Sequence, residues 1–155
     1  FETIRDNFLQ LFMDIFQTGR ADINLADKDN PLESEIQITF EPRQKKVDKL
    51  VMLSDGERAM MVICLLFAMY MVRPTPVCIM DEIDGPLDDA NVENFIKLLK
   101  RFRNKTQFIL ITHNKRTMEF CDYLFGVTME ESGITSIVSL NLQTISQKFL
   151  DNAAQ

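Results

Sequence analysis

The sequence predicts an α/β fold, with mainly parallel central strands and flanking helices, antiparallel strands near the N-terminus and a hairpin near the C-terminus. Two short apolar runs, residues 77–80 and 108–112, are separated by an amphipathic helical pattern at 90–103, as in parallel strands joined by a crossover helix. Alternation of apolar and polar residues at 21–25 and 36–40 indicates half-buried antiparallel strands. With 155 residues, 46% of them hydrophobic, the chain is long enough to build one core.

The composition argues against several classes of protein. The chain has 23 acidic and 17 basic residues, a net charge of −6, so its whole surface is not suited to wrapping nucleic acid, although a local basic patch is not excluded. The aromatic residues are nearly all Phe, without Trp, and nine Met accompany them. This indicates packed helix faces rather than a platform on which bases stack. The 12 Phe and ordinary charge content exclude a disordered chain.

The first predicted element is a helix at residues 1–16. Its apolar residues recur in steps of three and four, close to a heptad pattern, at Phe1, Ile4, Phe8, Leu11 and Ile15. Such a stripe fits either the end of a longer coiled coil or a helix that faces the core, and periodicity alone does not choose between them. The two antiparallel strands follow Gly19, with a loop at Asn30-Pro31 between them.

A second helix begins at a clear signal. Ser54 and Glu57 have the spacing of a capping box, an apolar run at 59–72 follows, and Pro74 and Pro76 end it. This run is 14 residues long, whereas a membrane span needs about 20, so we expect a buried core helix and no membrane segment. The strand at 77–80 is expected to be buried, as parallel strands usually are.

The rest of the chain predicts a helix at 115–121, a hairpin formed by 123–129 and 134–140, and a terminal segment with helical spacing from residue 141. Three cysteines, Cys64, Cys78 and Cys121, are odd in number and contain no Cys-x-x-Cys pair. We therefore expect neither a disulfide framework nor a structural zinc site, but small buried side chains in a reducing cytoplasm.

Polar clusters interrupt the apolar elements at three loops or helix starts, which in an open α/β sheet is where ligands bind. The first cluster is Leu53, Ser54, Asp55, Gly56 and Glu57. The N–H groups and positive dipole end of a helix N-terminus suit a phosphate, but the same residues also make an ordinary helix cap. The cluster alone leaves both interpretations open.

The second cluster is the pair Asp81 and Glu82, directly after the strand at 77–80. A carboxylate in this place can hold Mg²⁺ directly or through water, and its neighbour can accept a proton from attacking water. The third is His113, the single histidine, which follows the strand at 108–112 and could donate to a phosphate oxygen or orient water. Each also has a purely structural interpretation.

Together these clusters resemble the C-terminal half of an ABC-type ATPase head, and within that class the structural maintenance of chromosomes (SMC) proteins of prokaryotes. Residues 53–57 are similar to the signature motif, 77–82 to the Walker B strand with its glutamate, 84–89 to the D-loop and 112–114 to the switch histidine. The resemblance extends from residue 1 to about residue 142.

The resemblance implies a C-terminal lobe of an ABC-type (P-loop NTPase-like) head at 19–142, the end of a coiled coil at 1–18 and a tail at 143–155. It implies ATP and Mg²⁺ as cofactors. Asp81 would hold Mg²⁺ through water, Glu82 would act as general base or orient the water, and His113 would contact the γ-phosphate. Leu53, Ser54, Asp55, Gly56 and Glu57 would face the nucleotide of the opposite head, and Asp88 would line the interface between heads.

Two departures from the family pattern stand out. Asp55 occupies a position that is usually glycine, so its charge would weaken head engagement unless it points away and only favours the helix N-terminus. In addition, no Gly-x-x-x-x-Gly-Lys-Ser/Thr stretch occurs. We therefore expect the phosphate-binding loop on a separate N-terminal half, and no ATP hydrolysis by this segment alone.

The implied partners are the N-terminal half of the same head, a second SMC head, a kleisin subunit and double-stranded DNA. The kleisin would dock on the hairpin and the segment up to residue 142. DNA contact through the basic connection at 43–49 is a weaker idea. The implied location is cytoplasmic and nucleoid-associated. Two alternatives remain: the head of a double-strand-break repair ATPase, against which Pro86-Leu87-Asp88-Asp89 argues, and a non-catalytic module that only docks the kleisin.

Overall fold

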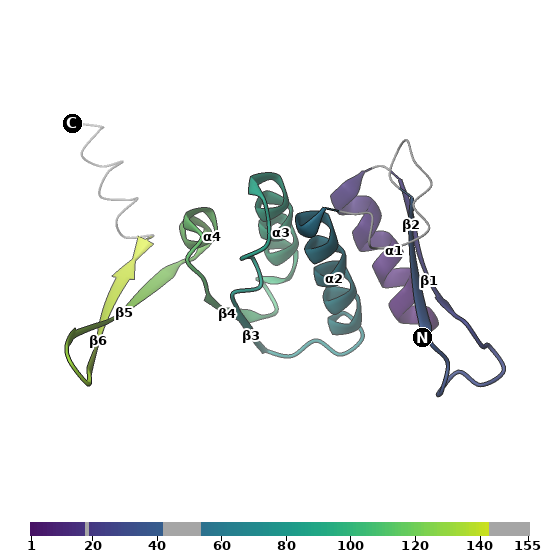
Figure 1. Cartoon of the computed structure of the whole chain (residues 1–155). Coiled ribbons are helices and arrows are strands. Elements are labelled where there is room, and N and C mark those ends of the chain that lie inside the picture. Colours follow the sequence, from purple (N-terminus) through teal and green to yellow (C-terminus); the bar gives the residue numbers. More distant parts are fainter. Residues whose placement is uncertain (18, 42–53, 143–155) are drawn as a thin grey trace. The chain divides into compact units, whose positions relative to one another are not determined.

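The computed structural model describes residues 1–17, 19–41 and 54–142. The chain divides into two compact units, residues 1–111 and 112–155, and each is described by itself. The first contains α1 (Glu2–Phe16), β1 (Arg20–Leu25), β2 (Ile36–Glu41), α2 (Asp55–Tyr70), β3 (Val77–Asp81), α3 (Asp89–Phe102) and β4 (Gln107–Ile111). The second contains α4 (Lys115–Phe120), β5 (Tyr123–Glu131) and β6 (Ile134–Asn141). Figure 1 traces these elements along the chain.

Three helices form the body of the first unit, with α2 packed between α1 and α3 (Figure 1). The apolar stripe of α1 is buried at Phe8, Leu11, Phe12 and Ile15, so this stripe faces the core. Polar contacts tie the helices together: the side-chain amide of Asn7 donates to the carbonyl of Ala68 over 3.1 Å. A salt bridge of 2.6 Å between Arg101 and Asp14 joins α3 to α1.

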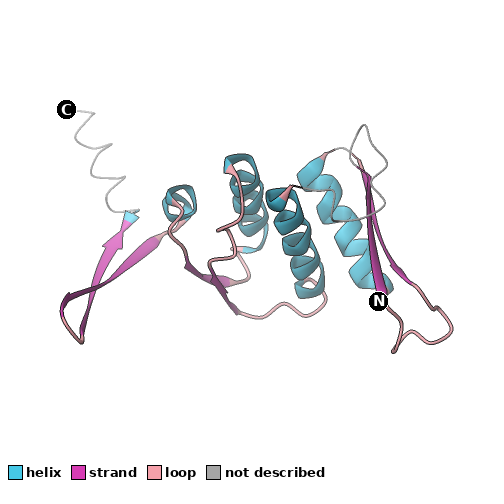
Figure 2. Ribbon diagram, viewed as in Figure 1, coloured by secondary structure: helices cyan, strands magenta, loops and turns pink. Residues whose placement is uncertain are grey.

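The predicted antiparallel strands are confirmed as β1 and β2, which pair from Arg20 opposite Glu41 to Leu25 opposite Ile36. This hairpin lies beside α1 (Figure 2). Ile23 is the residue of β1 that is fully buried, which agrees with a half-buried strand. The polar connection at 44–49 and the run at 50–53 lie outside the described residues.

The third and fourth strands form a two-stranded parallel sheet, and α3 is the crossover between them. Val77 pairs with Gln107 and Asp81 with Ile111, so both strands end at the same edge. The rings of Phe67 and Phe108 lie 6.3 Å apart, which places the core between α2 and this sheet.

The burial of this sheet corrects the prediction of a buried strand at 77–80. Ile79 is 66% exposed, and Val77, Ile109 and Ile111 are also exposed, because alternate residues face away from the helices. The apolar face of α2 shows the same pattern at Val62, Leu66 and Met69, so this helix is buried along only part of its surface. A continuous apolar run predicts that both faces of a strand or helix are buried. Whether the second face is buried depends on another element packing against it, which the run itself does not reveal.

The boundaries of α2 follow the predicted signals. Ser54 caps the helix, and Tyr70 is its last residue, four positions before Pro74. At this end the Tyr70 hydroxyl donates to the carbonyl of Thr75 over 2.8 Å and makes a further hydrogen bond with the hydroxyl of Thr106. Thr106 is buried, and its hydroxyl also reaches the Thr75 carbonyl over 3.3 Å. The hydrogen bonds among these three residues hold together the segments that precede β3 and β4.

The second unit consists of one short helix and a hairpin. Strands β5 and β6 pair antiparallel from Tyr123 opposite Asn141, with an irregularity between Thr128 and Glu131, and Gly133 takes a positive φ of 84° at the turn. The predicted hairpin is thus confirmed. The apolar side chains of both strands are largely exposed, including Phe125, Val127 and Ile137. The predicted terminal tail at 143–155 lies outside the described residues.

No helix in the described ranges is long and apolar enough to cross a membrane.

Candidate functional site

The acidic pair predicted from the sequence lies at the end of β3. Asp81 is the last residue of the strand and Glu82 follows it, and both side chains are exposed. The Glu82 amide donates to the carbonyl of Ile111 over 2.8 Å, which anchors the residue to β4. Glu82 also has a φ of 47°, a left-handed conformation that a residue with a Cβ adopts at a cost of about 1 kcal/mol or more. Non-glycine residues held in this way are concentrated at functional sites.

Two overlapping turns carry the chain from Glu82 to α3, and residues 82–88 are called the acid turn below. The Gly85 amide donates to the carbonyl of Glu82 over 3.0 Å, and the Leu87 amide donates to the carbonyl of Asp84 over 3.1 Å. Asp84 and Leu87 are buried, so the turn is anchored in the core rather than free in solvent. At its end, Asp88 caps α3 by accepting a hydrogen bond of 2.9 Å from the Asn91 amide.

The N-terminus of α2 carries the second predicted cluster, with a complete capping box. The Ser54 hydroxyl accepts from the Glu57 amide over 3.2 Å, and the Glu57 carboxylate accepts from the Ser54 amide over 3.0 Å. The Ser54 hydroxyl also donates to that carboxylate over 3.0 Å. The amides of Asp55 and Gly56 have no acceptor among the residues that the structure describes, as is usual in the first turn of a helix.

Asp55, the departure from the family pattern, has a side chain that is 90% exposed and lies 3.6 Å from the guanidinium of Arg58. In the first turn of α2 its charge favours the helix dipole. Leu53, the first residue of this cluster, lies outside the described residues.

The acid turn and the start of α2 meet at Gly56, which is buried. A Cβ atom on Gly56 would lie 3.3 Å from the Asn91 side-chain nitrogen, 3.5 Å from the Asp88 amide nitrogen and 3.5 Å from the Pro86 carbonyl. The structure therefore brings the predicted residues Ser54, Gly56 and Asp88 to one place, joined to Glu82 through the acid turn. Sequence reasoning missed Asn91, because a single asparagine in a helical pattern carries no spacing signal.

The side chains near the end of β3 show whether a magnesium ion could be held there. No cluster of three or more His, Cys, Asp or Glu side chains suited to a metal occurs among residues 1–17, 19–41 and 54–142. Mg²⁺, however, keeps several waters and is often held by one or two carboxylates together with substrate phosphates. The exposed Asp81 carboxylate suits that kind of site, in which the nucleotide supplies the other ligands.

His113, the third predicted residue, belongs to the second unit, so its place relative to the acid turn is not described. Its side chain is exposed. It precedes Asn114, which caps α4 by accepting a hydrogen bond of 3.0 Å from the Arg116 amide. The Asn114 amide donates in turn to the Thr112 hydroxyl over 2.9 Å. The loop that carries His113 is thus ordered by its own hydrogen bonds.

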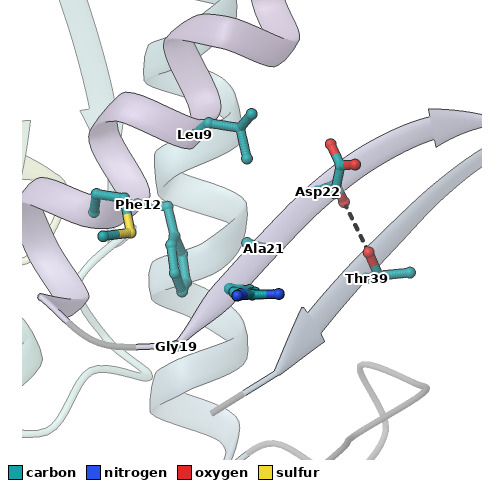
Figure 3. Close-up of a pocket in the computed structure, with 8 residues that line it drawn as sticks. Leu9, Phe12, Gly19, Ala21, Asp22 and Thr39 are labelled. Atoms are coloured by element: carbon teal, nitrogen blue, oxygen red, sulfur yellow. Dashed lines mark hydrogen bonds between the residues drawn. The ribbon is translucent and has the colours of Figure 1, made fainter. Parts of the chain in front are cut away.

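A hollow of about 480 Å³ lies away from these acids, between α1 and the β1–β2 hairpin. Figure 3 shows Leu9 and Phe12 of α1 at this hollow together with Ala21 and Asp22 of β1. The Thr39 hydroxyl contacts the Asp22 carbonyl at 3.5 Å. The hollow is open and holds none of the residues predicted to act on a nucleotide.

A forked ion pair fixes the side of this hollow. Arg5 donates from Nε to one oxygen of Asp22 over 2.6 Å and from Nη2 to the other over 2.8 Å. The hydrogen bond from Arg5 holds the pKa of the Asp22 carboxyl below its ordinary value, with help from the Ile23 amide and Asn24. The same bond raises the pKa of Arg5. This acid is used structurally, because both of its oxygens are bound.

The three cysteines are free thiols. Cys64 is fully buried, and burial raises the pKa of its thiol to about 12. Cys78 and Cys121 are only partly buried, which corrects the prediction that all three are buried.

The geometry is that of a unit of mixed α/β content in which an acid-ended strand and a helix N-terminus meet. The family model described as "RecF/RecN/SMC N terminal domain" matches residues 2–136, and the chain therefore belongs to this SMC family.

Individual proteins agree with this assignment. The chain is 48% identical over 145 residues to "Chromosome partition protein Smc" of Chlorobaculum tepidum, covering 92% of this chain and 12% of that relative. It thus spans about 12% of the length of such relatives. A solved chain described as "Structural biochemistry of ATP-driven dimerization and DNA stimulated activation of SMC ATPases" has a TM-score of 0.81 and 32% identity, covering 99% of this chain and 92% of that one.

A further structure is the Smc head domain with an extended coiled coil bound to the C-terminal domain of ScpA, derived from Pyrococcus furiosus. It has a TM-score of 0.83 and 32% identity, covering 99% of this chain and 38% of that one. The structural neighbours are thus SMC ATPase heads of mixed α/β content.

The family match contradicts one prediction. We expected the C-terminal part of the head, with the phosphate-binding loop on a missing N-terminal half, whereas the matching model is described as an N-terminal domain. The prediction depended on the absence of a single motif. Because the chain spans only about 12% of its relatives, such an absence does not fix its place in them. The assignment to the C-terminal half is withdrawn.

Proposed function

We propose that this chain forms part of the ATP-binding and ATP-hydrolysing head of a chromosome-partition protein of the SMC family. The observation that carries the proposal is the exposed pair Asp81 and Glu82 at the end of a parallel strand, linked by the acid turn to the N-terminus of α2. The names of the relatives support the biological context, since they are chromosome partition proteins.

The residues of the site have distinct tasks in this proposal. The Asp81 carboxylate holds Mg²⁺, which when bound neutralises charge on the phosphates. Glu82, which is exposed, accepts a proton from, or orients, the attacking water. His113 donates to the γ-phosphate.

The N-terminus of α2 binds a nucleotide presented by a second head. The amides of Asp55 and Gly56 supply hydrogen-bond donors at the positive end of the helix dipole. Ser54 and Glu57 complete this surface, and Asp88 lies beside it at the interface between heads. Because the capping box already uses the Ser54 hydroxyl, that hydroxyl reaches a phosphate only after it releases the Glu57 carboxylate.

The segment alone is expected to be inactive, because its sequence has no Gly-x-x-x-x-Gly-Lys-Ser/Thr loop to cradle the phosphates. We propose that residues 19–142 form the head segment, against which α1 packs with its apolar stripe. The proposed partners are a second head, a kleisin subunit, as in the ScpA-bound head structure, and double-stranded DNA, as in the DNA-stimulated SMC ATPases. The proposed location is the nucleoid in the cytoplasm.

The test is the variant Glu82→Gln in the full-length protein that contains this segment. Hydrolysis should fall about 10²–10⁴-fold, the scale of losing an acid–base group, while ATP-dependent dimerisation persists. Phosphate release and analytical ultracentrifugation with ATP measure the two properties. Glu93→Gln, a matched change at an exposed position on α3, serves as control. Undiminished hydrolysis by Glu82→Gln would rule the proposal out.

A further inference from the structure

We propose that Asn91 is a positioning residue that holds the N-terminus of α2 and the acid turn as one mechanical unit. The inference rests on the proposed function for its catalytic consequence, while its structural part stands separately. It assigns a task to a residue outside the predicted site.

The first step is the burial of Asn91. This residue is only 7% exposed, although asparagine is usually found at the surface. Its backbone amide is used by the Asp88 cap, and its side-chain amide makes no hydrogen bond within the described part of the chain. No fully buried side-chain nitrogen or oxygen among the described residues lacks a partner, so the Asn91 amide keeps some contact with solvent, and packing against its neighbours fixes its place.

The second step is the contact with Gly56. A Cβ atom at this glycine would lie 3.3 Å from the Asn91 nitrogen, closer than most Cβ atoms approach a neighbour, and would also touch the backbone of Pro86 and Asp88. The missing side chain of Gly56 therefore points into the protein, toward the acid turn, and not toward a ligand. Asn91 fills the space that the glycine leaves open.

The third step is the link from this contact to Glu82. The acid turn runs from Glu82 through the two turn hydrogen bonds, and its last part lies against Gly56. From the other side, a Cβ atom on Gly85 would meet the Glu82 carbonyl at 3.2 Å. A shift of α2 is therefore transmitted through short backbone contacts to the strained residue that carries the candidate base.

The consequence is that nucleotide binding at the start of α2 changes the position of Glu82 in the same head. Asn91 sets the distance between the two, and its loss changes the placement of the carboxylate rather than the affinity for ATP. Misplacement of a catalytic group by a fraction of an ångström to about 1 Å lowers the turnover number by up to about 10²-fold.

The experiment is a double-mutant cycle in the full-length protein with Gly56→Ala and Asn91→Ala. Gly56→Ala should lower kcat about ten-fold and change the KM for ATP less than about three-fold, because the added methyl group presses on Asn91. Asn91→Ala alone should lower kcat by a few-fold. The double variant should hydrolyse faster than Gly56→Ala alone, because the smaller side chain accommodates the methyl group.

Asn94→Ala is the matched control, because it removes the same side chain from α3 at a half-buried position whose amide oxygen only accepts a hydrogen bond of 3.2 Å from Lys97. Hydrogen exchange of residues 82–91 provides a readout that does not need ATP hydrolysis. Gly56→Ala should speed exchange at the amides of Gly85 and Leu87, and the double variant should restore protection.

The outcomes separate the two proposals. If Glu82→Gln hydrolyses ATP like the wild type but the exchange pattern follows the cycle, the proposed function fails and the mechanical link stands. If Gly56→Ala leaves both kcat and exchange unchanged, or if Asn91→Ala gives no rescue of either, the link is overturned.

Discussion

The two ends of the β3–β4 pair both carry polar residues, but these residues differ in burial and in their contacts. Where the strands begin, Tyr70, Thr75 and Thr106 bind one another, and Thr106 is buried. Where the strands end, Asp81 and Glu82 are exposed, and Glu82 has a strained left-handed backbone. Buried polar groups that satisfy one another stabilise a fold, whereas residues held in a strained backbone conformation are concentrated at functional sites. The comparison teaches that polar residues at the first end serve the fold, and it supports our proposal that the site lies at the second end.

The strongest test of this contrast is Glu82→Gly, with Glu82→Ala as its control. Both variants should lose hydrolysis by about 10²–10⁴-fold, since both lack the carboxylate. Glycine adopts a positive φ without strain, so Glu82→Gly should be more stable than Glu82→Ala by about 0.5–1 kcal/mol. Phosphate release and thermal unfolding of the full-length protein measure these effects. If the Glu82→Gly protein is no more stable than the Glu82→Ala protein, the backbone at Glu82 is not strained.

At the opposite end, Tyr70→Phe should destabilise the protein by about 1–2 kcal/mol. The hydroxyl is lost, and the buried Thr106 hydroxyl and the Thr75 carbonyl each lose a partner. Hydrolysis should be unchanged at temperatures where the protein is folded. Urea unfolding together with steady-state kinetics gives both values, and a specific loss of kcat without loss of stability would break the contrast between the two ends.

Asp88 caps α3 and is also proposed to line the interface between heads, and two substitutions distinguish these tasks. Asp88→Ala removes the cap of α3 and should cost about 1 kcal/mol, whereas Asp88→Ser keeps a capping oxygen and should cost only a few tenths. If both variants lose ATP-dependent dimerisation equally, the charge acts at the interface between heads. If only Asp88→Ala loses it, the cap is the whole contribution. Chemical unfolding and ultracentrifugation decide between these results.

The smallest effect is expected at Asp22, an acid whose two oxygens are already bound by Arg5. Its pKa is lowered in the folded protein, so its stabilising effect is complete above the ordinary carboxyl pKa of about 4 and is lost as the pH falls through the lowered value. Asp22→Asn should therefore be less stable than the wild type at pH 7, and the difference should shrink below about pH 4. Thermal unfolding at pH 7, 5 and 3 checks this, and a difference independent of pH would contradict it.

Much of the fold could be predicted from the sequence because local signals are strong here. Ser54 and Glu57 predict the start of α2, Pro74 its end, and the alternation around Ile23 and Ile38 predicts the first hairpin. The acids at 81 and 82 are recognisable because they directly follow an apolar run. Burial was less predictable, as Ile79 shows, because an apolar pattern does not say which of its neighbours are present.

The sequence by itself determined the elements, the acids at the end of β3 and the resemblance to SMC heads, since these depend on residue types at short spacing. Only the tertiary structure decided that Gly56 lies against the acid turn, that Asn91 fills the space beside it and that Glu82 has a left-handed backbone. These features arise where segments about 30 residues apart meet, and close packing between distant segments leaves no periodic signal in a single sequence.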